Sequence, residues 1–276
     1  MPATGSKSYH PLSLSIRLRA DGFSFFVCDL QTSSLIRGEH FRLADSHSLA
    51  EQLSQELMRP DYFNRQIDQC FVLLCSLSTR VPLEEFRREE AAELYQFTFA
   101  NQQDLRQRVA YNILPQLECA ELYAIPTEVE EAILQFYPTA RFFASRAILM
   151  ERLLLLEDDQ PQNRASLCVC AETDSYSLYS FQDRRLRFAN TFPIENTPDA
   201  LYFILNVWQQ LGLDQTRDTL KFLAPQTEED QRLISALAEY LRNIEVLTPA
   251  DIFHRVPLAR EKQVPLDLMA LLLNRI

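Results

Sequence analysis

The chain has 276 residues, 47% of them apolar and 24% charged, and it carries a formal net charge of −11 at pH 7. This acidic but otherwise ordinary globular composition disfavours a non-specific binder of nucleic acid or of an anionic membrane, because both need a basic surface. Only four residues are glycine, where about 19 would be usual. Glycine allows the positive φ and the close backbone approach that phosphate loops need, so chemistry built on glycine-rich loops is disfavoured.

The first residues are polar, and Lys7 is the only lysine or arginine before His10. No apolar stretch follows, so no signal peptide is predicted, and residues 1–9 are interpreted as a disordered lead-in. Apolar runs such as Leu153–Leu156 are far shorter than the ~20 residues of a membrane span. The six cysteines form no C-x-x-C and the four histidines never pair at ligand spacing, so we expect free buried thiols in a reducing cytoplasm and no metal site.

Three strands and a helix are predicted first. Residues 12–19, LSLSIRLR, alternate apolar with polar side chains, the pattern of a half-buried strand. Asp21-Gly22 predicts a two-residue hairpin turn of type I′, and strands follow at 23–29 and 35–43. Ser48 and Glu51 then form an S-x-x-E capping box at the start of a helix.

The next segment, at about 69–119, is interpreted as a small inserted α+β module. Its predicted elements are a strand at 71–75, a helix at 83–96, a strand at 97–99 and a helix at 104–117.

The second part of the chain repeats the opening pattern. Strands are predicted at 166–171, 176–181 and 185–192, with turns at 173–175 and 183–184. Thr197 is the predicted N-cap of the following helix, Pro198 its first residue and Gly212 its stop.

A further correspondence links ELYAIPTEVEEAILQFYP (121–138) with TLKFLAPQTEEDQRLISALAEYL (219–241). In both, a strand ends in proline, and a threonine-capped helix with an acidic first turn follows. Each half then closes with a strand (140–145 and 244–247) and an apolar helix (147–156 and 266–274).

The predicted element order is therefore β-β-β-α-β-α-β-α, twice. It predicts an α/β fold with mixed sheets, in which two duplicated subdomains surround a cleft and the first carries the insertion. The first half is expected at 10–156 and the second at 165–276, with the polar stretch 157–164 as a hinge.

This pattern resembles the actin-like ATPase superfamily, whose halves are ribonuclease H-like, and the insertion resembles that of its cell-division and pilus-assembly members. The proline-ended strands ELYAIP and LKFLAP, the segment FVLLCSLSTRVPLEEF and the whole-length layout are similar to an uncharacterised family from Bacteroides-type bacteria. Those features are structural, so the resemblance specifies a fold and no activity.

The resemblance implies that a nucleotide would lie between two β-hairpin turns, whose backbone N–H groups hold phosphate and whose carboxylates position Mg²⁺. The cleft candidates for cofactor binding are Asp21 and Gly22 in the first turn and Thr173, Asp174 and Ser175 in the second. The first turn is followed at once by bulky phenylalanines, and the second lacks glycine. Both are therefore interpreted in the first place as plain hairpin turns.

The superfamily's adenosine-binding stretch usually contains a glycine pair, and the matching stretch here is Ala224-Pro225-Gln226. Proline removes a backbone donor and fixes φ, so this loop would have the wrong shape for the nucleotide. No catalytic residue, metal ligand or cofactor is assigned.

The favoured hypothesis is a non-catalytic protein of actin-like fold that works by contact with another protein, through the inserted module. The alternative is a divergent Mg-ATP-binding ATPase or kinase that uses Asp21, Asp174 and Ser175 in the cleft between the halves. A small-molecule sensor that uses the same cleft is a third possibility.

Overall fold

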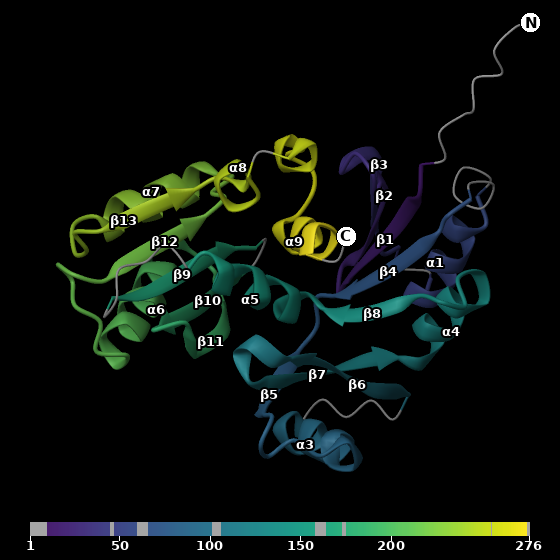
Figure 1. Cartoon of the computed structure of the whole chain (residues 1–276), viewed down its shortest axis with the longest axis horizontal. Coiled ribbons are helices and arrows are strands. Elements are labelled where there is room, and N and C mark those ends of the chain that lie inside the picture. Colours follow the sequence, from purple (N-terminus) through teal and green to yellow (C-terminus); the bar gives the residue numbers. More distant parts are fainter. Residues whose placement is uncertain are drawn as a thin grey trace, which may run out of the picture. The chain divides into compact units, whose positions relative to one another are not determined.

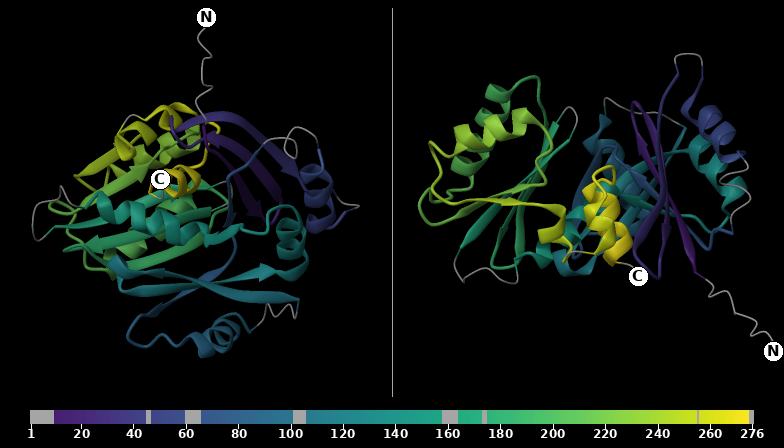
Figure 2. Two further views of the ribbon diagram at one scale, coloured as in Figure 1. Left: turned by 45° about the vertical axis from the view of Figure 1, so that its right-hand side comes forward. Right: turned by 90° about the horizontal axis from the view of Figure 1, so that it is seen from above.

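The computed structural model describes residues 10–44, 47–59, 66–100, 106–157, 164–172, 175–254 and 256–274. By its internal contacts the chain divides into unit 1, Met1–Leu149 with Val256–Ile276, and unit 2, Met150–Arg255. Each unit contains a five-stranded mixed sheet, and unit 1 adds a three-stranded sheet (Figures 1 and 2). The predicted class, α/β with mixed sheets, is confirmed. The expected lead-in at 1–9 and residues 158–163 of the expected hinge lie outside the described residues.

Sheet A of unit 1 has the strand order β3-β2-β1-β4-β8. Its strands are β1 (Leu12–Arg19), β2 (Gly22–Asp29), β3 (Ser34–Arg42), β4 (Gln69–Leu74) and β8 (Arg141–Ala144). β1, β2 and β3 form the predicted antiparallel meander, whereas β4 and β8 extend the sheet in parallel with β1. The carboxyl ends of β1, β4 and β8 therefore share one edge of the sheet.

β1 is buried on both faces, which corrects the prediction of a half-buried strand. Leu14 and Ile16 on one face have no exposed surface, as expected. Ser13 and Ser15 on the other face are equally buried, and Arg17 is only 9% exposed. The polar residues of the alternation are thus covered by protein, and Arg17 among them contacts Asp267 of the C-terminal segment.

Helices α1 (Leu49–Leu57) and α4 (Thr127–Phe136) lie side by side against sheet A (Figures 1 and 2). The capping box of α1 is present, with Ser48 as N-cap and Glu51 closing it. The threonine cap predicted for α4 is wrong, because Thr127 is already the first helical residue and no side chain caps this helix. The N–H of Thr127 donates instead to the carbonyl of Arg106.

Sheet B, with the order β5-β7-β6, is a separate three-stranded antiparallel sheet of unit 1. Its elements are β5 (Ser78–Pro82), the short 3-10 turn η1 (Arg88–Glu90), α3 (Ala91–Thr98), β6 (Gln107–Leu114), η3 (Pro115–Leu117) and β7 (Cys119–Pro126). α3 packs on one face of the sheet, where Ala91 and Tyr95 meet Leu122 of β7 (Figure 1).

The membership of two strands differs from the prediction that the insertion spans about 69–119. β4, expected inside the module, is a central strand of sheet A, and β7, expected in the main sheet, is the central strand of sheet B. The inserted structure therefore lies between β4 and α4. β7 and β12 are both apolar strands with a proline at or near their end and a helix after it. The sheet that a strand joins depends on its pairing with other strands, which such a local pattern does not show.

Two elements predicted inside the module are also wrong. Residues 97–98 end α3 rather than begin a strand, and residues 107–114 form strand β6 rather than a helix. Val109 and Tyr111 both pack on the cluster around Tyr95, and their spacing of two residues is the period of a strand.

Sheet B closes the open edge of sheet A through side chains. The Asn112 side-chain carbonyl accepts from the Ala144 N–H at 2.8 Å, and its amide donates to the Phe142 carbonyl at 3.3 Å. The Tyr123 hydroxyl donates to the same carbonyl at 2.8 Å. An amide side chain thus takes the place of a neighbouring strand beside β8, which leaves no bare edge there for another chain.

Sheet C of unit 2 has the order β11-β10-β9-β12-β13, the same topology as sheet A. Its strands are β9 (Ala165–Ala171), β10 (Ser175–Gln182), β11 (Arg185–Pro193), β12 (Thr219–Leu223) and β13 (Ile244–Leu247). The turn between β10 and β11 is the predicted pair Asp183-Arg184, and both residues have positive φ, 50° and 61°, as a type I′ turn requires.

Helices α6 (Thr197–Gln210) and α7 (Glu228–Leu237) pack on one face of sheet C around Trp208, Leu233 and Phe222. The N-cap of α6 is Asn196, one residue before the predicted Thr197, and its side chain accepts from the Asp199 N–H. The predicted stop is confirmed, since α6 ends at Gln210 and Gly212 follows with φ +66°.

Helix α5 (Ser145–Leu155) begins in unit 1, and its residues from Met150 onward belong to unit 2. After α8 (Pro249–Ile252), the chain continues with η4 (Pro257–Arg260) and α9 (Leu266–Asn274), which belong to unit 1. The expected halves 10–156 and 165–276 therefore differ from the contact units, because the last helix of the second half packs in unit 1.

The β1–β2 turn is the predicted hairpin, but its geometry differs from the predicted type I′. Arg19 pairs with Gly22, so the two turn residues are Ala20 and Asp21, and neither has positive φ. Gly22 has φ +149°, and a Cβ built there would lie 2.1 Å from the Phe41 carbonyl oxygen. Glycine is required here because β3 passes against the turn.

Gly22→Ala is expected to lower the free energy of unfolding by about 3–5 kcal/mol, since it combines backbone strain with a clash against backbone atoms. Urea denaturation followed by circular dichroism measures the loss.

Gly212→Ala is the matched control. Gly212 also has positive φ, +66°, but no atom lies within 4 Å of a Cβ placed there. Only the left-handed backbone cost of about 1–2 kcal/mol is expected. Equal losses in the two variants would contradict the packing role of Gly22.

Candidate functional site

The predicted cleft residues belong to two different units. Asp21 and Gly22 form the β1–β2 hairpin of unit 1, and Ser175 begins β10 in unit 2. Thr173 and Asp174 lie outside the described residues. Each turn is therefore described within its own unit.

The first turn is occupied by interactions of its own. The Asp21 carboxylate accepts from Arg19 Nε at 2.9 Å, and this hydrogen bond holds the pKa of Asp21 below its ordinary value. The Asp21 carbonyl accepts from the Leu43 N–H at 2.9 Å, which ties the turn to the end of β3. Together with the fit of Gly22 against Phe41, these contacts give aspartate and glycine a structural role at this turn that requires no ligand.

The second turn is also closed by its own backbone. The Ser175 carbonyl accepts from the Glu172 N–H at 2.9 Å, and Ser177 Oγ donates to the Glu172 carboxylate at 3.1 Å. Ser177 Oγ lies 2.8 Å from Thr191 Oγ1 of β11. The described groups of this turn serve the pairing of β9, β10 and β11.

The loop where the resemblance places adenosine leads into α7. Asp230, 3% exposed, accepts from the N–H groups of Gln226 and Thr227, both at 2.9 Å. The Tyr176 hydroxyl donates to the same carboxylate at 2.7 Å. Burial alone would raise the pKa of Asp230, but these hydrogen bonds outweigh it and hold the pKa below its ordinary value. Backbone donors that an anion would use are thus bound to a carboxylate of the chain.

A cluster of four residues, three of them buried, lies at the carboxyl edge of β4 and β8, where α/β sheets commonly bind ligands. Its centre is Asp267 of α9, which is 4% exposed. Asp267 Oδ2 accepts from Arg17 Nε at 2.8 Å, from Ser145 Oγ at 2.5 Å and from Cys75 Sγ at 3.7 Å. We call Arg17, Cys75, Ser145 and Asp267 the Asp267 cluster.

The charge state of Asp267 follows from these partners. Burial would raise its pKa, but the Arg17 charge, the Ser145 hydroxyl and the Leu268 N–H hold the pKa below its ordinary value. The carboxylate is therefore ionised at neutral pH. It occupies the guanidinium and the hydroxyl that would otherwise be suited to bind a substrate anion at this edge.

Unit 2 contains a buried ion pair of the same kind. Lys221 of β12 is 1% exposed, and its Nζ donates to the Glu157 carboxylate at 2.7 Å. Ser166 Oγ of β9 donates to the same carboxylate oxygen at 2.9 Å. Glu157 lies two residues after the end of α5, so a strand and the segment after a helix are joined by a buried charge pair.

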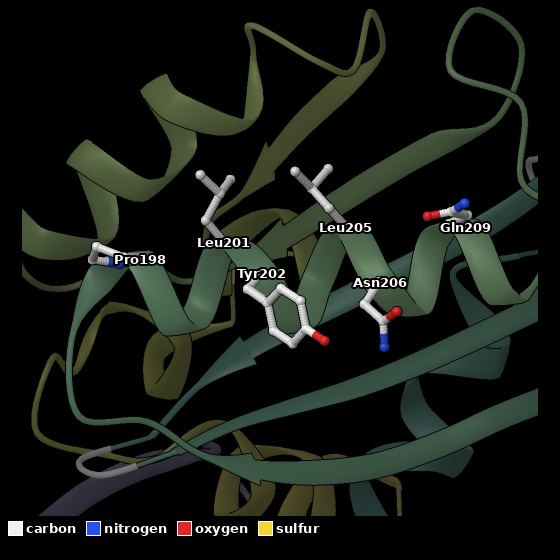
Figure 3. A pocket seen from close by; sticks show the side chains of 6 residues that line it. All are labelled: Pro198, Leu201, Tyr202, Leu205, Asn206 and Gln209. Atoms are coloured by element: carbon white, nitrogen blue, oxygen red, sulfur yellow. The ribbon is translucent and has the colours of Figure 1, made fainter.

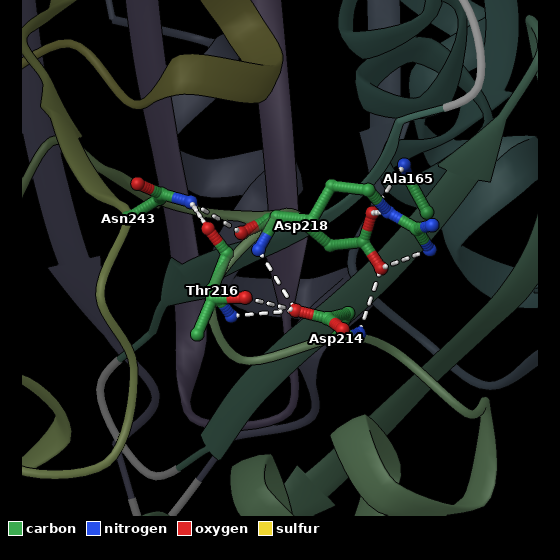
Figure 4. A network of polar contacts seen from close by, with 6 residues as sticks. Ala165, Asp214, Thr216, Asp218 and Asn243 are labelled. Atoms are coloured by element: carbon green, nitrogen blue, oxygen red, sulfur yellow. Dashed lines mark hydrogen bonds and ion pairs between the residues drawn. The ribbon is translucent and has the colours of Figure 1, made fainter.

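A third polar network is centred on Asp218, which is 2% exposed (Figure 4). Its carboxylate accepts from the Ala165 N–H at 3.1 Å and the Asp214 N–H at 2.7 Å. Asn243 donates to the carbonyls of Thr216 and Asp218 (Figure 4). These bonds join the loop before β12 to the start of β9 and to the residue before β13, which is a structural role.

Sequence reasoning missed Arg17, Asp267, Glu157 and Lys221. Arg17 and Asp267 are 250 residues apart, so no local spacing connects them. One signal was present in the sequence: Lys221 interrupts the apolar strand TLKFL, and Asp267 interrupts the apolar helix LDLMALLLN. A charge inside an apolar element indicates a buried partner.

Over the part of the chain that the structure describes, no group of three or more His, Cys, Asp or Glu side chains is placed to hold a metal ion. Among the same residues, no helix is long and apolar enough to cross a membrane. None of the six cysteines, all of which the structure describes, forms a disulfide, and five of them are buried.

Arg17→Met is expected to destabilise the protein by about 3–5 kcal/mol at neutral pH, because it leaves the buried Asp267 carboxylate unpaired. Folding lowers the pKa of Asp267. Its stabilising contribution is therefore fully present above the unfolded pKa of about 3.9 and is lost as the pH falls through the lower folded value. The loss caused by Arg17→Met should accordingly shrink as the pH falls, first because the unpaired buried carboxyl of the variant takes up a proton and then because the wild type loses its ion pair below about 4.

Urea titrations at neutral and at acidic pH test this expectation. Arg19→Met is the matched control, because the Arg19–Asp21 pair is surface-exposed and should contribute less than about 1 kcal/mol. A loss for Arg17→Met that is the same at both pH values would contradict the ionised state of Asp267.

Comparison with known proteins supports the architecture. A family model described as "Protein of unknown function (DUF3822)" matches residues 6–244. Among solved structures, the chain is similar to a Bacteroides thetaiotaomicron protein with an actin-like ATPase fold and unknown function, at 25% identity and a TM-score of 0.79, covering 95% of this chain and 96% of that one. It is also similar to a chain of the PilM–PilN type IV pilus biogenesis complex, at 13% identity and a TM-score of 0.56, covering 95% and 97%.

A comparison with curated proteins gives no match. The predicted resemblance to actin-like ATPases is confirmed at the level of the fold, which both structural relatives share over nearly their whole length. Since the family model covers most of the sequence, the chain belongs to the DUF3822 family.

Proposed function

We propose that this protein is a non-catalytic member of the actin-like fold that works by contact with another protein. The observation that carries the proposal is that carboxylates of the chain itself occupy its anion-binding groups. Asp230 binds the N–H groups before α7, and Asp267 binds Arg17 and Ser145. Neither place is one of the hairpin turns to which the resemblance assigns phosphate. Any anionic ligand at the start of α7 or at the carboxyl edge of sheet A would have to displace a buried, ionised carboxylate, which costs several kcal/mol.

Two further features support the loss of nucleotide chemistry. Gly22, the glycine of the candidate phosphate turn, is required by its fit against Phe41. Pro225 lies in the loop that leads to α7 and has no N–H to offer a ligand. The same strand order in sheets A and C supports an origin of both halves by internal duplication. Six cysteines that form no disulfide favour the cytoplasm as the place where the protein acts.

The inserted module is the proposed contact surface. Phe97 on α3 is 86% exposed, more than any other large apolar side chain among the described residues. The PilM–PilN complex, a structural neighbour, is an assembly of two proteins, which favours a protein partner for this fold as well.

A thermal-shift titration with Mg-ATP and Mg-ADP tests the loss of nucleotide binding. A nucleotide at 100 times its Kd would stabilise a binder by about 2.7 kcal/mol, or a shift of several degrees at this chain length. We expect no shift at millimolar nucleotide. A shift that Asp21→Ala abolishes would overturn the proposal and favour the divergent ATPase or kinase.

Site-specific photo-crosslinking in cells that make the protein tests the contact surface. A photoreactive residue in place of Phe97 should capture one defined partner. The same residue at Met58, which is 60% exposed outside the module, should not capture it. Capture from Met58 but not from position 97 would place the contact elsewhere, and no capture from either would contradict the module's role.

A further inference from the structure

One edge of sheet C carries a cluster of arginines. β11 is the last strand in the order of this sheet, so among the described strands it has a neighbour, β10, on one side only (Figure 1). Arg184 lies in the turn before β11, and Arg185 and Arg187 are among the first three residues of the strand. All three side chains are exposed.

The strand register brings a fourth arginine to the same corner of the sheet. Arg185 pairs with Gln182 of β10, and Gln182 pairs with Ala165, the first residue of β9. Arg164, which is also exposed, directly precedes Ala165. Neighbouring strands lie about 4.8 Å apart, so about 10 Å separate the backbone at Arg164 from that at Arg185. We call Arg164, Arg184, Arg185 and Arg187 the arginine corner.

Ion pairs within the protein do not balance the charge of this corner. Asp183 lies in the same turn as Arg184 and is the nearest acid in the sequence. On the other side of β9, Asp218 is buried and pairs with Arg217. The whole chain carries −11, so the corner differs in sign from most of the surface. Among the described residues, none forms an ion pair with Arg164, Arg185 or Arg187.

Charge distinguishes the arginine corner from the open groove on α6. That groove has a volume of about 310 Å³, and all the residues that line it are uncharged (Figure 3). Its shape alone selects no particular partner. Charge of one sign at the corner favours a partner of the opposite sign and disfavours the others.

The edge of β11 is protected in a way that depends on charge. Charged side chains and β-bulges commonly prevent an edge strand from pairing with other chains. β11 has both, because Arg187 is the extra residue of a bulge opposite Ser180 and Phe181. Every charge on this strand is positive. The protection therefore acts against basic segments, whereas an acidic segment is attracted.

We propose that the arginine corner binds an acidic segment of a partner protein, which extends along the edge of β11. Guanidinium groups donate paired hydrogen bonds to carboxylates, and a sheet edge offers backbone groups to an added strand. A nucleic acid or an anionic membrane has no strand to add, and either would be repelled by the acidic remainder of the chain. This contact involves unit 2, whereas Phe97 belongs to unit 1, so it holds or fails independently of the contact proposed above.

Fluorescence anisotropy of the whole chain with a labelled peptide of alternating glutamate and threonine tests the proposal. We expect the wild type to bind this acidic peptide, and the variant Arg185→Glu/Arg187→Glu to raise the Kd by at least about tenfold. A peptide with glutamine in place of every glutamate should not bind. Added salt should weaken the binding of the acidic peptide, because it screens the opposite charges.

Arg106→Glu/Arg260→Glu is the matched control, because it makes the same change of charge at exposed arginines of unit 1. This variant should bind the acidic peptide as the wild type does. Arg164→Glu lies outside the β10–β11 hairpin and should weaken binding too, so the result does not depend on one variant. Circular dichroism shows that each variant is folded.

Hydrogen exchange tests the position of the bound peptide. The backbone amides of 185–193 should exchange more slowly when the acidic peptide is present, because an added strand protects them.

Four results would overturn the proposal. They are no binding of the acidic peptide at low salt, an equal loss of binding in the control variant, unchanged exchange of the β11 amides, and tighter binding of an oligo-dT strand or of phosphatidylserine vesicles than of the peptide. The last result would replace a protein partner by a general polyanion.

Discussion

The buried ion pairs are the interactions on which the rest of the structure depends. Arg17 in unit 1 and Lys221 in unit 2 lie on central strands, on faces that are closed to water. A buried cation without a partner costs several kcal/mol, so each strand needs a carboxylate that arrives on another element. Asp267 at the start of α9 and Glu157 just after α5 supply it. Removing water from four charges is expensive, and well-placed additional hydrogen bonds from Ser145 and Ser166 offset part of that cost.

These pairs also define the position of elements that are distant in the sequence. Hydrophobic burial alone would allow an apolar helix to pack on the sheet in several positions, because it is not directional. The carboxylate of Asp267 must meet both Arg17 and Ser145, which allows one register. Such specificity is the best-attested role of buried polar groups, and it explains why charged residues interrupt an otherwise apolar helix and strand.

The same internal bonding bears on function. A fold that binds nucleotide needs donors that remain open until the ligand arrives. Here the donors before α7 are bound to Asp230, and Gly22 is fitted against β3. The shared fold and the proposed lack of activity are therefore compatible, because the fold depends on strand pairing and core packing, whereas activity would depend on donors that the chain now uses itself.

Local patterns predicted most of the elements. The capping box at Ser48, the turn Asp183-Arg184 and the stop at Gly212 were each recognisable from neighbouring residues. The order of the predicted strands and helices then indicated the mixed α/β class. The helix predicted at 104–117 was wrong because the alternation of Val109 and Tyr111 is short and has polar residues around it. The sheets to which β4 and β7 belong were predicted the wrong way round for a different reason. Both are apolar strands, and only their pairing with other strands distinguishes them.

By itself the sequence predicted the fold class, most of the strands and helices, several of their caps and turns, and the family resemblance, because these depend on residues within a few positions of one another. Only the tertiary structure decided which face of β1 is covered, which sheet receives β7, and which acid neutralises Arg17. Those outcomes depend on contacts between residues as many as 250 positions apart, and no periodicity or spacing along the chain records them.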